Sequence, residues 1–459
     1  MSPPDRFTLA GAGLVGSLLA LFLARRGAEV RVLERRPDLR KERIRAGRSI
    51  NLAISVRGLH ALGRVGLEQK ALAHAIPLRG RMIHPSEGAL AFQPYGKDDT
   101  QCINSISRAW LNGMLLSEAE ATGRVRIDFH HRVTALDVGA GAVTVVDERS
   151  GRQERISGTA VLGTDGAGSV VREAIVSDAG GTSTEERLDH GYKELTLPAG
   201  PNGGFRLEKH ALHIWPRRDF MLIALPNLDG SFTCTLFLRF DGSPSFATLD
   251  SPRAVRAFFG AQFPDVVSLL PDLEEQFFEN PTGSMVTVKC WPWAAEGRAL
   301  VLGDAAHAIV PFFGQGMNCG FEDCELLDEV MARRPEPGRA FPEVARLRKP
   351  NADAIADMAV ENFVEMRDSV ADPRFLLEKA IERRLLNALP GEFLSRYALV
   401  TFSRVPYRRA AEVGRVASAI VSELASGVAS AEEVDLERAR ALVRARLAPV
   451  LERIEGSED

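Results

Sequence analysis

The sequence has few lysines and few cysteines, and these shortages exclude several classes of protein. Only eight of its 57 cationic residues are lysines, and the formal net charge of −4 gives no basic character of the kind that nucleic-acid binding needs. The odd number of cysteines and the lack of a CxxC pair argue against a disulfide framework, a zinc site or a redox-active dithiol. The five are Cys102, Cys234, Cys290, Cys319 and Cys324.

The sequence also lacks a convincing membrane segment. The run Phe7–Ala24 is uncharged for eighteen residues, which is close to the length of a membrane helix. Three glycines interrupt it, and Asp5 offsets Arg6, so the positive start of a signal peptide is missing. The C-terminal region has no apolar run either. We therefore expect no membrane anchor and a cytoplasmic protein.

The order of hydrophobic patterns predicts a mixed α/β chain that opens with a strand, a helix and a second strand. Residues 7–10 are apolar, residues 14–26 are rich in helix formers, and residues 29–33 alternate as a strand does. This βαβ order implies a parallel sheet. Most of the segment from about 185 to 295 is expected to form antiparallel strands that could wall a buried site. The remainder is expected to be helical, with a capping box at Ser430–Glu433.

The first turn carries the pattern GxGxxG, formed by Gly11, Gly13 and Gly16. Such glycines allow a tight turn and a close approach of a pyrophosphate to the backbone at a helix N-terminus. Glu34 ends the second expected strand, where a carboxylate can accept hydrogen bonds from ribose hydroxyls. The sequence therefore predicts a dinucleotide site, which NAD or FAD could fill.

Two further segments place an aspartate at the end of a short apolar strand. Asp165 lies in Thr-Asp-Gly and Asp304 in Gly-Asp-Ala-Ala-His, and each could meet a ribose or ribityl hydroxyl. Taken individually, either would more often be a turn or cap residue. The second segment is followed by the glycine-rich sequence of residues 311–318, whose backbone N–H groups could receive the pyrimidine edge of a flavin.

Taken together, the GxGxxG turn, the mid-chain Asp-Gly, the GDAAH segment and PxxGQGMN resemble the single-component flavoprotein aromatic hydroxylases. Further segments are similar to the kynurenine 3-monooxygenases within that group, and the likeness extends from residue 7 to about 407. These segments are 47–53, 79–84, 94–96, 190–192, 212–216, 223–227, 232–237, 361–366, 397 and 400–404. Mitochondrial members carry a C-terminal hydrophobic anchor that this sequence lacks, and the stretch beyond about 410 matches nothing familiar.

The resemblance implies an FAD- and NADPH-dependent monooxygenase that converts L-kynurenine to 3-hydroxykynurenine with O₂, through a C4a-hydroperoxyflavin. The flavin carries this chemistry, so no protein nucleophile and no metal is expected. His307 is interpreted as structural. The alternatives are a flavin hydroxylase for another aromatic acid, an NAD-dependent dehydrogenase, and a flavin-bearing binding protein without turnover.

The resemblance also implies the residues of both sites. Beside the glycines, those expected to contact FAD are Val15, Leu33, Glu34, Arg35, Arg36, Ala53, Arg108, Val133, Asp165, Asp304, Gly316 and Met317. The amino-acid end of the substrate would meet Arg81, Tyr95, Asn362 and Tyr397, and its ring would meet Leu212, Met221, Ile223 and Phe237. A guanidinium suits a carboxylate that enters a desolvated pocket.

The expected fold is a Rossmann-like FAD-binding domain, an antiparallel β-sheet substrate domain and a helical C-terminal region. The FAD-binding domain would comprise residues 1–183 and 296–370, with the substrate domain at 184–295 inserted between them. The helical region would follow at 371–459.

Overall fold

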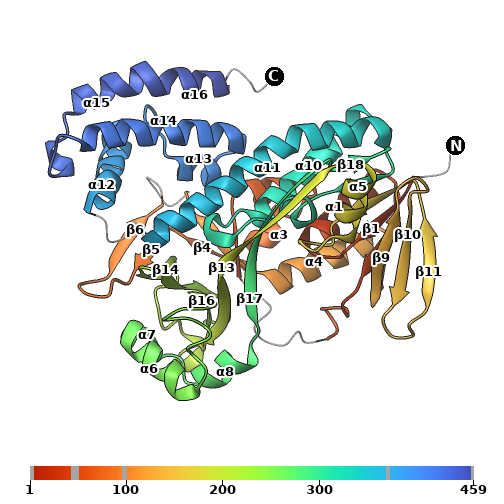
Figure 1. The fold of residues 1–459 in the computed structure, drawn as a ribbon, viewed down its shortest axis with the longest axis horizontal. Helices are drawn as coiled ribbons and strands as arrows, with labels where there is room; N and C mark the ends of the chain where they lie inside the picture. The colour runs from red at the N-terminus through yellow and green to blue at the C-terminus, as the bar shows by residue number, and fades with distance from the viewer. Residues whose placement is uncertain (1–4, 43–50, 96–100, 369–372, 456–459) are drawn as a thin grey trace.

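The structure is a computed structural model that describes residues 5–42, 51–95, 101–368 and 373–455. Gly47, Arg48, Ser49, Ile50 and Gly96, which contribute to the resemblance, lie outside the described residues, as does the expected domain boundary after residue 370. Figure 1 shows a parallel sheet with its helices at one end, a second sheet below the centre, and the C-terminal helices at the far end.

The parallel sheet contains the βαβ unit that the sequence predicts. Its strand order is β18-β19-β12-β1-β2-β8, and all neighbours are parallel except β18 with β19. Since β19 pairs with β12, the chain returns to this sheet after building the second one. The strands are β1 (Arg6–Ala10), β2 (Glu29–Glu34), β8 (Val125–Phe129), β12 (Ala160–Gly163), β18 (Ala294–Ala295) and β19 (Ala299–Val301).

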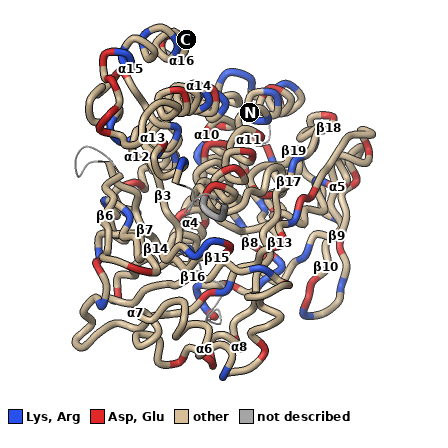
Figure 2. Tube along the Cα trace, turned by 60° about the vertical axis from the view of Figure 1, so that its left-hand side comes forward, with Lys and Arg blue, Asp and Glu red and all other residues tan. Residues whose placement is uncertain are grey.

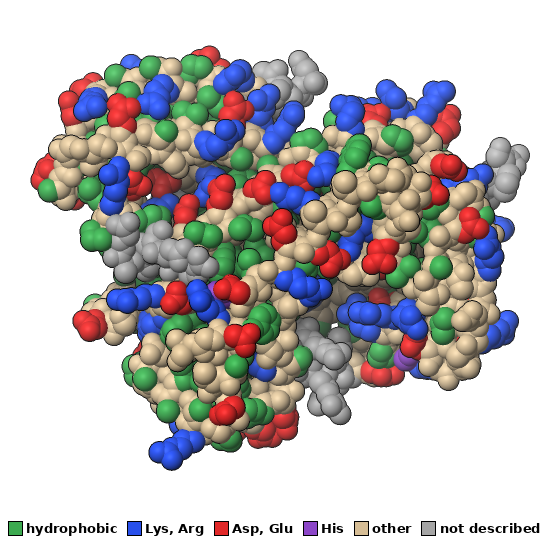
Figure 3. All heavy atoms as spheres, in the orientation of Figure 1, with side chains coloured by type: hydrophobic (Ala, Val, Ile, Leu, Met, Phe, Trp, Pro, Cys, Tyr) green, Lys and Arg blue, Asp and Glu red, His purple; other side chains and the backbone are tan. Residues whose placement is uncertain are grey.

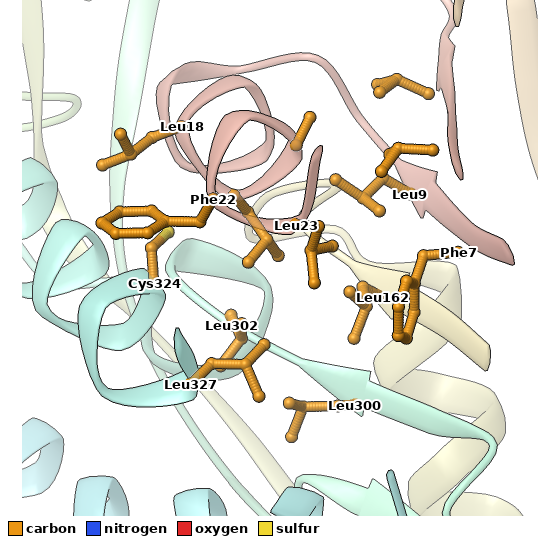
Figure 4. Close-up of a cluster of buried hydrophobic side chains, with 14 of the residues drawn as sticks. Phe7, Leu9, Leu18, Phe22, Leu23, Leu162, Leu300, Leu302, Cys324 and Leu327 are labelled. Atoms are coloured by element: carbon orange, nitrogen blue, oxygen red, sulfur yellow. The ribbon is translucent and has the colours of Figure 1, made fainter. Parts of the chain in front are cut away.

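The uncharged run near the N-terminus forms a helix at the centre of the protein core. Helix α1 (Leu14–Arg25) is buried along nearly its whole length between the sheet and helices α4 (Arg108–Ala121) and α10 (Gly316–Arg333). Figure 4 shows Phe22 and Leu23 of α1 packed among side chains of the strands and of α10. A helix that is apolar all round belongs in such a core. None of the helices in the described ranges is long and apolar enough to cross a membrane.

The second sheet is mostly antiparallel, in the order β17-β13-β16-β15-β14-β5-β6, with one parallel pair, β14 with β5. Two small three-stranded sheets flank it and the parallel sheet. The strands of the second sheet are β5 (Gly80–Ile83), β6 (Ala91–Pro94), β13 (Thr182–Leu197), β14 (Ala211–Arg217), β15 (Phe220–Pro226), β16 (Phe232–Arg239) and β17 (Thr282–Trp291). The small sheets contain β3 (Asn51–Ile54), β4 (Ala75–Leu78) and β7 (Ile103–Ser107), and β9 (His131–Asp137), β10 (Ala142–Asp147) and β11 (Gln153–Ser157).

The expectation of strands through most of residues 185–295 missed three helices. These are α6 (Pro252–Gln262), α7 (Pro264–Val267) and α8 (Leu273–Glu279). Their aromatic side chains, among them Phe259 and Phe263, pack on Trp215 and Leu236, on one face of the second sheet. The stripe they form has helical spacing, and prolines at the first positions of α6 and α7 begin each helix. The opposite face of the sheet is left for the site.

The chain after β19 is helical, as expected. Figure 1 shows α11 reaching from the parallel sheet to the C-terminal helices. The prediction of a capping box at Ser430 was wrong, because the Ser430 side chain makes no cap hydrogen bond. Asp435 instead caps the next helix and accepts from the N–H groups of Glu437 and Arg438. The remaining helices are α2 (Val56–Arg64), α3 (Glu68–Leu72), α5 (Val170–Asp178), α9 (Asp304–His307), α11 (Pro337–Asp368), α12 (Pro373–Ala388), α13 (Arg396–Phe402), α14 (Tyr407–Ala425), α15 (Leu436–Leu442) and α16 (Ala448–Glu455).

Charged residues of both signs are interspersed along the chain. Figure 2 shows basic and acidic positions mixed through the trace, and Figure 3 shows the same mixture on the face that it draws.

Candidate active site

The glycine turn between β1 and α1 is closed too tightly for side chains at two of its three glycines. Gly11 has φ of 96°, and a Cβ built on it would lie 2.6 Å from the carbonyl oxygen of Thr164. A Cβ on Gly16 would lie 2.1 Å from the carbonyl oxygen of Gly11. The turn therefore packs directly on the end of β12 and needs glycine at both positions.

Gly13 is different, because a Cβ there would meet no atom within 4 Å. It is the N-cap of α1, so its surroundings form an open cradle in front of the free N–H groups of the helix. This is the arrangement that a pyrophosphate requires.

Glu34 braces the cradle from the end of β2. One carboxylate oxygen accepts from the N–H of Ala12 at 2.8 Å, and the other accepts from the backbone N–H and the guanidinium of Arg36, each at 2.9 Å. Burial raises the pKa of Glu34, but the bonds to Arg36 and Ala12 lower it more, so the net shift is downward. Glu34 is thus ionised, and its remaining lone pairs can accept from a hydroxyl.

Two residues that hydrogen-bond to the turn were not predicted as site residues from the sequence. Asn112 of α4 donates to the carbonyl oxygen of Ala12 at 3.1 Å and accepts from Ser17 at 3.1 Å. The hydroxyl of Thr164 donates to the carbonyl oxygens of Ala10 and Gly11, at 2.9 and 3.0 Å. The only sequence feature that could have indicated Thr164 is its place directly before Asp165 in the Asp-Gly motif. No motif surrounds Asn112.

The two aspartates of the later motifs have different surroundings. Asp165 accepts from the Ser169 hydroxyl at 2.6 Å and from the Val170 N–H at 2.9 Å, so its carboxylate caps the start of α5. Burial raises the pKa of Asp165. Asp304 begins α9 with an exposed side chain, beside the buried Ala305 and Ala306. Asp304 is therefore the freer of the two to bind a hydroxyl.

The GQGMN segment forms the first turn of α10 and lies against β3. The side chain of Asn318 donates to the carbonyl oxygen of Ala53 at 3.0 Å and accepts from the N–H of Ser55 at 3.0 Å. Gly314 lies next to Ala53, just before α10, and has φ of 66°. This left-handed conformation turns the chain into the helix. The structure thus joins two predicted FAD segments, at Ala53 and at Gly316, that are far apart in the sequence.

The open cradle at Gly13, the ionised Glu34, the exposed Asp304 and the free N-terminus of α10 fit an FAD molecule. The other residues predicted to contact it lie around these elements in two groups. Arg35, Arg36 and Arg108 are exposed, while Val15, Leu33, Val133 and Met317 are buried or partly buried in the core of the parallel sheet.

The substrate residues predicted at Arg81, Tyr95 and Tyr397 come together between β5, the end of β6 and α13. The guanidinium carbon of Arg81 lies 4.7 Å from the ring centroid of Tyr397 and 5.5 Å from that of Tyr95. The two tyrosine rings stack with centroids 5.6 Å apart. The paired strands β5 and β6 and the sequence-distant helix α13 thus build one cationic, aromatic corner.

Buried polar atoms in this corner lack partners. Within the described residues, neither Nε of Arg81 nor the hydroxyl of Tyr95 has a hydrogen-bond partner, although both atoms are buried. Burial lowers the pKa of Arg81, but the oxygens of Tyr397 and Tyr95 raise it more, so this side chain stays charged. Burial also raises the pKa of Tyr95 well above its usual value, which keeps its hydroxyl protonated. An anion would satisfy both groups.

The four predicted apolar residues and Arg81 lie on one face of the second sheet, because cross-strand partners and residues two apart share a side. Ile223 packs against both clusters that line this face, one containing Met221 and Phe237 and the other Leu212 and Tyr95. Three register pairs place them: Arg81 with Leu212, Ile214 with Ile223, and Met221 with Phe237.

Asn362 of α11 is linked to the same region by Phe312. Its amide donates to the carbonyl oxygen of Phe312 at 2.8 Å, and the Phe312 ring stacks on Phe363 at 4.5 Å and lies 5.0 Å from Phe237. Phe312 was not predicted as a site residue, although it belongs to the PxxGQGMN motif.

His307 lies in a buried ion network. Its Nε2 lies 2.6 Å from Asp323, which also binds the guanidinium of Arg348 at 2.6 Å. His307, Cys319 and Asp323 have ligand atoms within 4.8 Å of one another, as a metal site would require. Arg348 already contacts the sulfur of Cys319 at 3.1 Å, so a guanidinium provides the cation there. This geometry agrees with the interpretation of His307 as structural.

Comparison with known proteins supports the flavin interpretation of the turn. The family model described as "FAD binding domain" matches residues 8–198 and 284–339, so it leaves out strands β14–β16 and helices α6–α8. The 2-methyl-3-hydroxypyridine-5-carboxylic acid oxygenase has the same fold, with a TM-score of 0.66, 20% identity and coverage of 82% of this chain and 96% of its own. The fold class and the bound cofactor expected from the sequence are thereby confirmed.

Full-length relatives define the family more narrowly. A kynurenine 3-monooxygenase from Myxococcus xanthus (strain DK1622) is 62% identical over 447 residues, which cover 97% of this chain and 96% of that protein. A kynurenine 3-monooxygenase from Xanthomonas campestris pv. campestris (strain 8004) is 44% identical, over 97% and 98% of the two chains. The chain therefore belongs to the kynurenine 3-monooxygenase family of FAD-dependent aromatic hydroxylases.

Proposed function

We propose that this protein hydroxylates L-kynurenine to 3-hydroxykynurenine in the cytoplasm, using bound FAD, NADPH and O₂. The observation that carries the substrate assignment is the corner formed by Arg81, Tyr95 and Tyr397 at the edge of an apolar sheet face. L-Kynurenine has the matching shape, with an ionised amino-acid end and an aromatic ring that carries an amino group.

In this proposal the corner binds the carboxylate of the substrate. Arg81 supplies the charge, and the protonated hydroxyl of Tyr95 donates a hydrogen bond that it lacks in the described structure. Tyr397 and Asn362 complete the polar shell. Because Nε of Arg81 and the hydroxyl of Tyr95 are already buried without hydrogen-bond partners among the described residues, less of the binding energy is lost to desolvating them.

The ring of the substrate would lie on the face formed by Leu212, Met221, Ile223 and Phe237. These side chains offer no hydrogen bond, so they orient the ring by shape and exclude water from it. Excluding water protects a reactive oxygen donor from hydrolysis and keeps the aromatic carbon as its target.

FAD would be held at the cradle, where the N–H groups at the start of α1 would bind its pyrophosphate and Glu34 and Asp304 would accept hydrogen bonds from its hydroxyls. Bound FAD supplies the redox chemistry, taking electrons from NADPH and using O₂ to deliver one oxygen atom to the ring. The residues proposed to contact it are those predicted above, including Asp165, whose carboxylate also caps α5.

Product analysis tests the proposal. Purified protein should be yellow, and L-kynurenine should stimulate NADPH oxidation and yield 3-hydroxykynurenine by mass spectrometry. A benzoate and an anthranilate serve as matched controls, since they carry a carboxylate and a ring but no amino-acid side chain. Hydroxylation of either of these in preference to L-kynurenine would assign a different aromatic acid, and protein without flavin absorbance would contradict the proposal altogether.

A further inference from the structure

Arg57 of α2 is one of the largest fully buried side chains in the described protein, with an exposure of 1%. An arginine is seldom buried unless its N–H groups are paired. Its Nη1 binds a carboxylate oxygen of Glu322 in α10 at 2.6 Å. Burial lowers its pKa, but Glu322 raises it more, and the guanidinium remains charged.

The other donors of Arg57 hold the C-terminal end of α13. Nε donates to the carbonyl oxygen of Val400 at 2.8 Å, and Nη2 donates to those of Leu399 and Val405 at 3.3 and 2.5 Å. The last carbonyls of a helix have no partner within the helix, and a positive charge near them is favourable. Arg57 thus satisfies the end of the short helix that carries Tyr397.

The helix that presents Arg57 is itself fixed to the flavin side of the molecule. Ser55, its N-cap, donates its N–H to Asn318, and Glu322 lies one turn further along α10. A second link runs in parallel, since the guanidinium lies 4.0 Å from the ring centroid of Tyr407, whose hydroxyl donates to Gln315 at 3.0 Å. The proposed substrate-binding helix is therefore connected to the start of α10.

We propose that Arg57 is a positioning residue for substrate binding, which holds α13 so that Tyr397 faces Arg81. This inference rests on the proposed function, because it assigns a purpose to Tyr397. It also gives the C-terminal helical region a role, since α13 can contribute to the carboxylate site only while it is docked on α2. Arg57 acts through Tyr397 and touches neither substrate nor flavin in this scheme.

The test compares Arg57→Lys with the wild-type holoenzyme. Lysine keeps the charge near Glu322 but cannot reach three carbonyls at once with the geometry of a guanidinium. FAD content and thermal unfolding are measured first, and L-kynurenine is then titrated against the flavin absorbance. We expect stoichiometric FAD and a Kd for L-kynurenine raised about tenfold, the size of losing one hydrogen bond to a charged group.

Arg64→Lys is the matched control. Arg64 lies on the same helix and pairs with Asp328 and Glu329 of α10, at 3.2 and 2.7 Å. It should change the Kd for L-kynurenine by less than about twofold, since partly exposed ion pairs contribute little. An equal effect of both variants would assign the loss to α2 in general and overturn the inference.

A double-mutant cycle with Tyr397→Phe separates positioning from general stability. If Arg57 acts through the Tyr397 hydroxyl, Arg57→Lys should weaken binding in the wild type but hardly at all in the Tyr397→Phe background. Additive effects would overturn the inference, and so would loss of FAD from Arg57→Lys, which would assign the network to the flavin.

A second variant covers the case in which Arg57→Lys does not fold. Arg57→Met combined with Glu322→Gln removes both members of this ion pair together, a change that proteins often tolerate, and Arg348, which also contacts Glu322, keeps its bond to Asp323. It should keep FAD and show the same weakened L-kynurenine binding, and wild-type affinity would overturn the inference. If the wild type itself gives no response to L-kynurenine, the proposed function fails and this inference with it. A responsive wild type and an equally tight variant would remove this inference alone.

Discussion

The guanidinium of Arg81 lies over the ring of Tyr397, with its carbon 4.7 Å from the ring centroid, although the two residues belong to opposite halves of the chain. Strand β5 and helix α13 meet at this contact. A cation on an aromatic face is stabilised by the ring but keeps its N–H groups available in the plane of the guanidinium. The contact therefore holds a charge ready for an anion rather than neutralising it.

Arg81→Ala should leave FAD in place and weaken the binding of L-kynurenine. Loss of a desolvated charge partner costs roughly 2–5 kcal/mol, or about 30- to several-thousand-fold in affinity. Titration of the substrate against the flavin absorbance measures the change. Arg81→Lys should recover only part of the affinity, because an ammonium cannot bind a carboxylate at two points.

Arg79→Ala is the internal control for that experiment. Arg79 is exposed and precedes β5, whereas Arg81 lies within the strand and contacts both tyrosine rings. Its replacement should leave substrate affinity nearly unchanged. If Arg79→Ala is the variant with weakened substrate binding, Arg79 rather than Arg81 binds the carboxylate. If neither variant loses affinity, the carboxylate is bound elsewhere.

Tyr95→Phe tests the unpartnered hydroxyl. Because this buried hydroxyl has no partner among the described residues, its removal should not lower the stability of the free protein. Substrate affinity should nevertheless fall by roughly tenfold or more, the value of a hydrogen bond to a charged group. Thermal unfolding without substrate measures the stability, and titration of L-kynurenine against the flavin absorbance measures the affinity. A destabilised variant with unchanged affinity would make the hydroxyl structural.

The sequence predicts those parts of the site that depend on local geometry. The glycine turn and the carboxylate at Glu34 follow from short motifs, because a tight turn and a strand end constrain the few residues that form them. The residue pattern alone does not distinguish Arg79 from Arg81, since both would face one side of an extended strand, and the prediction of Arg81 comes from the family resemblance. Their difference arises where the strand begins, and only the structure defines that.

Non-local contacts account for most of what the sequence could not show. Arg57 reads as an ordinary arginine on an amphipathic helix, and its burial depends on α13, more than 300 residues away. Asn112 had no motif around it, and its role follows from the packing of α4 on α1. The helices α6–α8 were missed because their aromatic residues resemble buried strand positions until the second sheet is seen.

Gly13→Val should abolish FAD binding while the fold is largely kept. A Cβ at this position meets no protein atom within 4 Å, so the valine fits the protein but would occupy the space of the pyrophosphate. Flavin absorbance per protein and circular dichroism measure the two effects. Gly260→Val in α6 is the control, since a Cβ is equally unobstructed there and the glycine lies far from the turn in the fold. Stoichiometric flavin in Gly13→Val would show that the turn does not bind the pyrophosphate.

His307 should make the stability of the protein fall as pH rises. Burial lowers the pKa of His307, but the neighbouring Asp323 and Cys319 raise it more, and the net result lies well above the ordinary value. Above pH of about 6.5 the unfolded chain loses this proton while the folded chain keeps it, so stability falls by up to about 1.4 kcal/mol per pH unit. Below that pH the contribution of His307 is fully present.

The same reasoning predicts what replacing His307 does. Asp323 has a lowered pKa and stays ionised. His307→Gln removes one of the cations beside this carboxylate, which keeps its bonds to Arg348 and to the N–H of Gly303. Chemical unfolding at pH 6 and pH 8.5 should show a less stable variant at pH 6 and a smaller loss of stability between the two values. His74→Gln, at an exposed histidine, is the control substitution. Equal slopes for wild type and His307→Gln would mean that His307 has the same pKa in the folded and the unfolded protein, which would contradict the raised pKa.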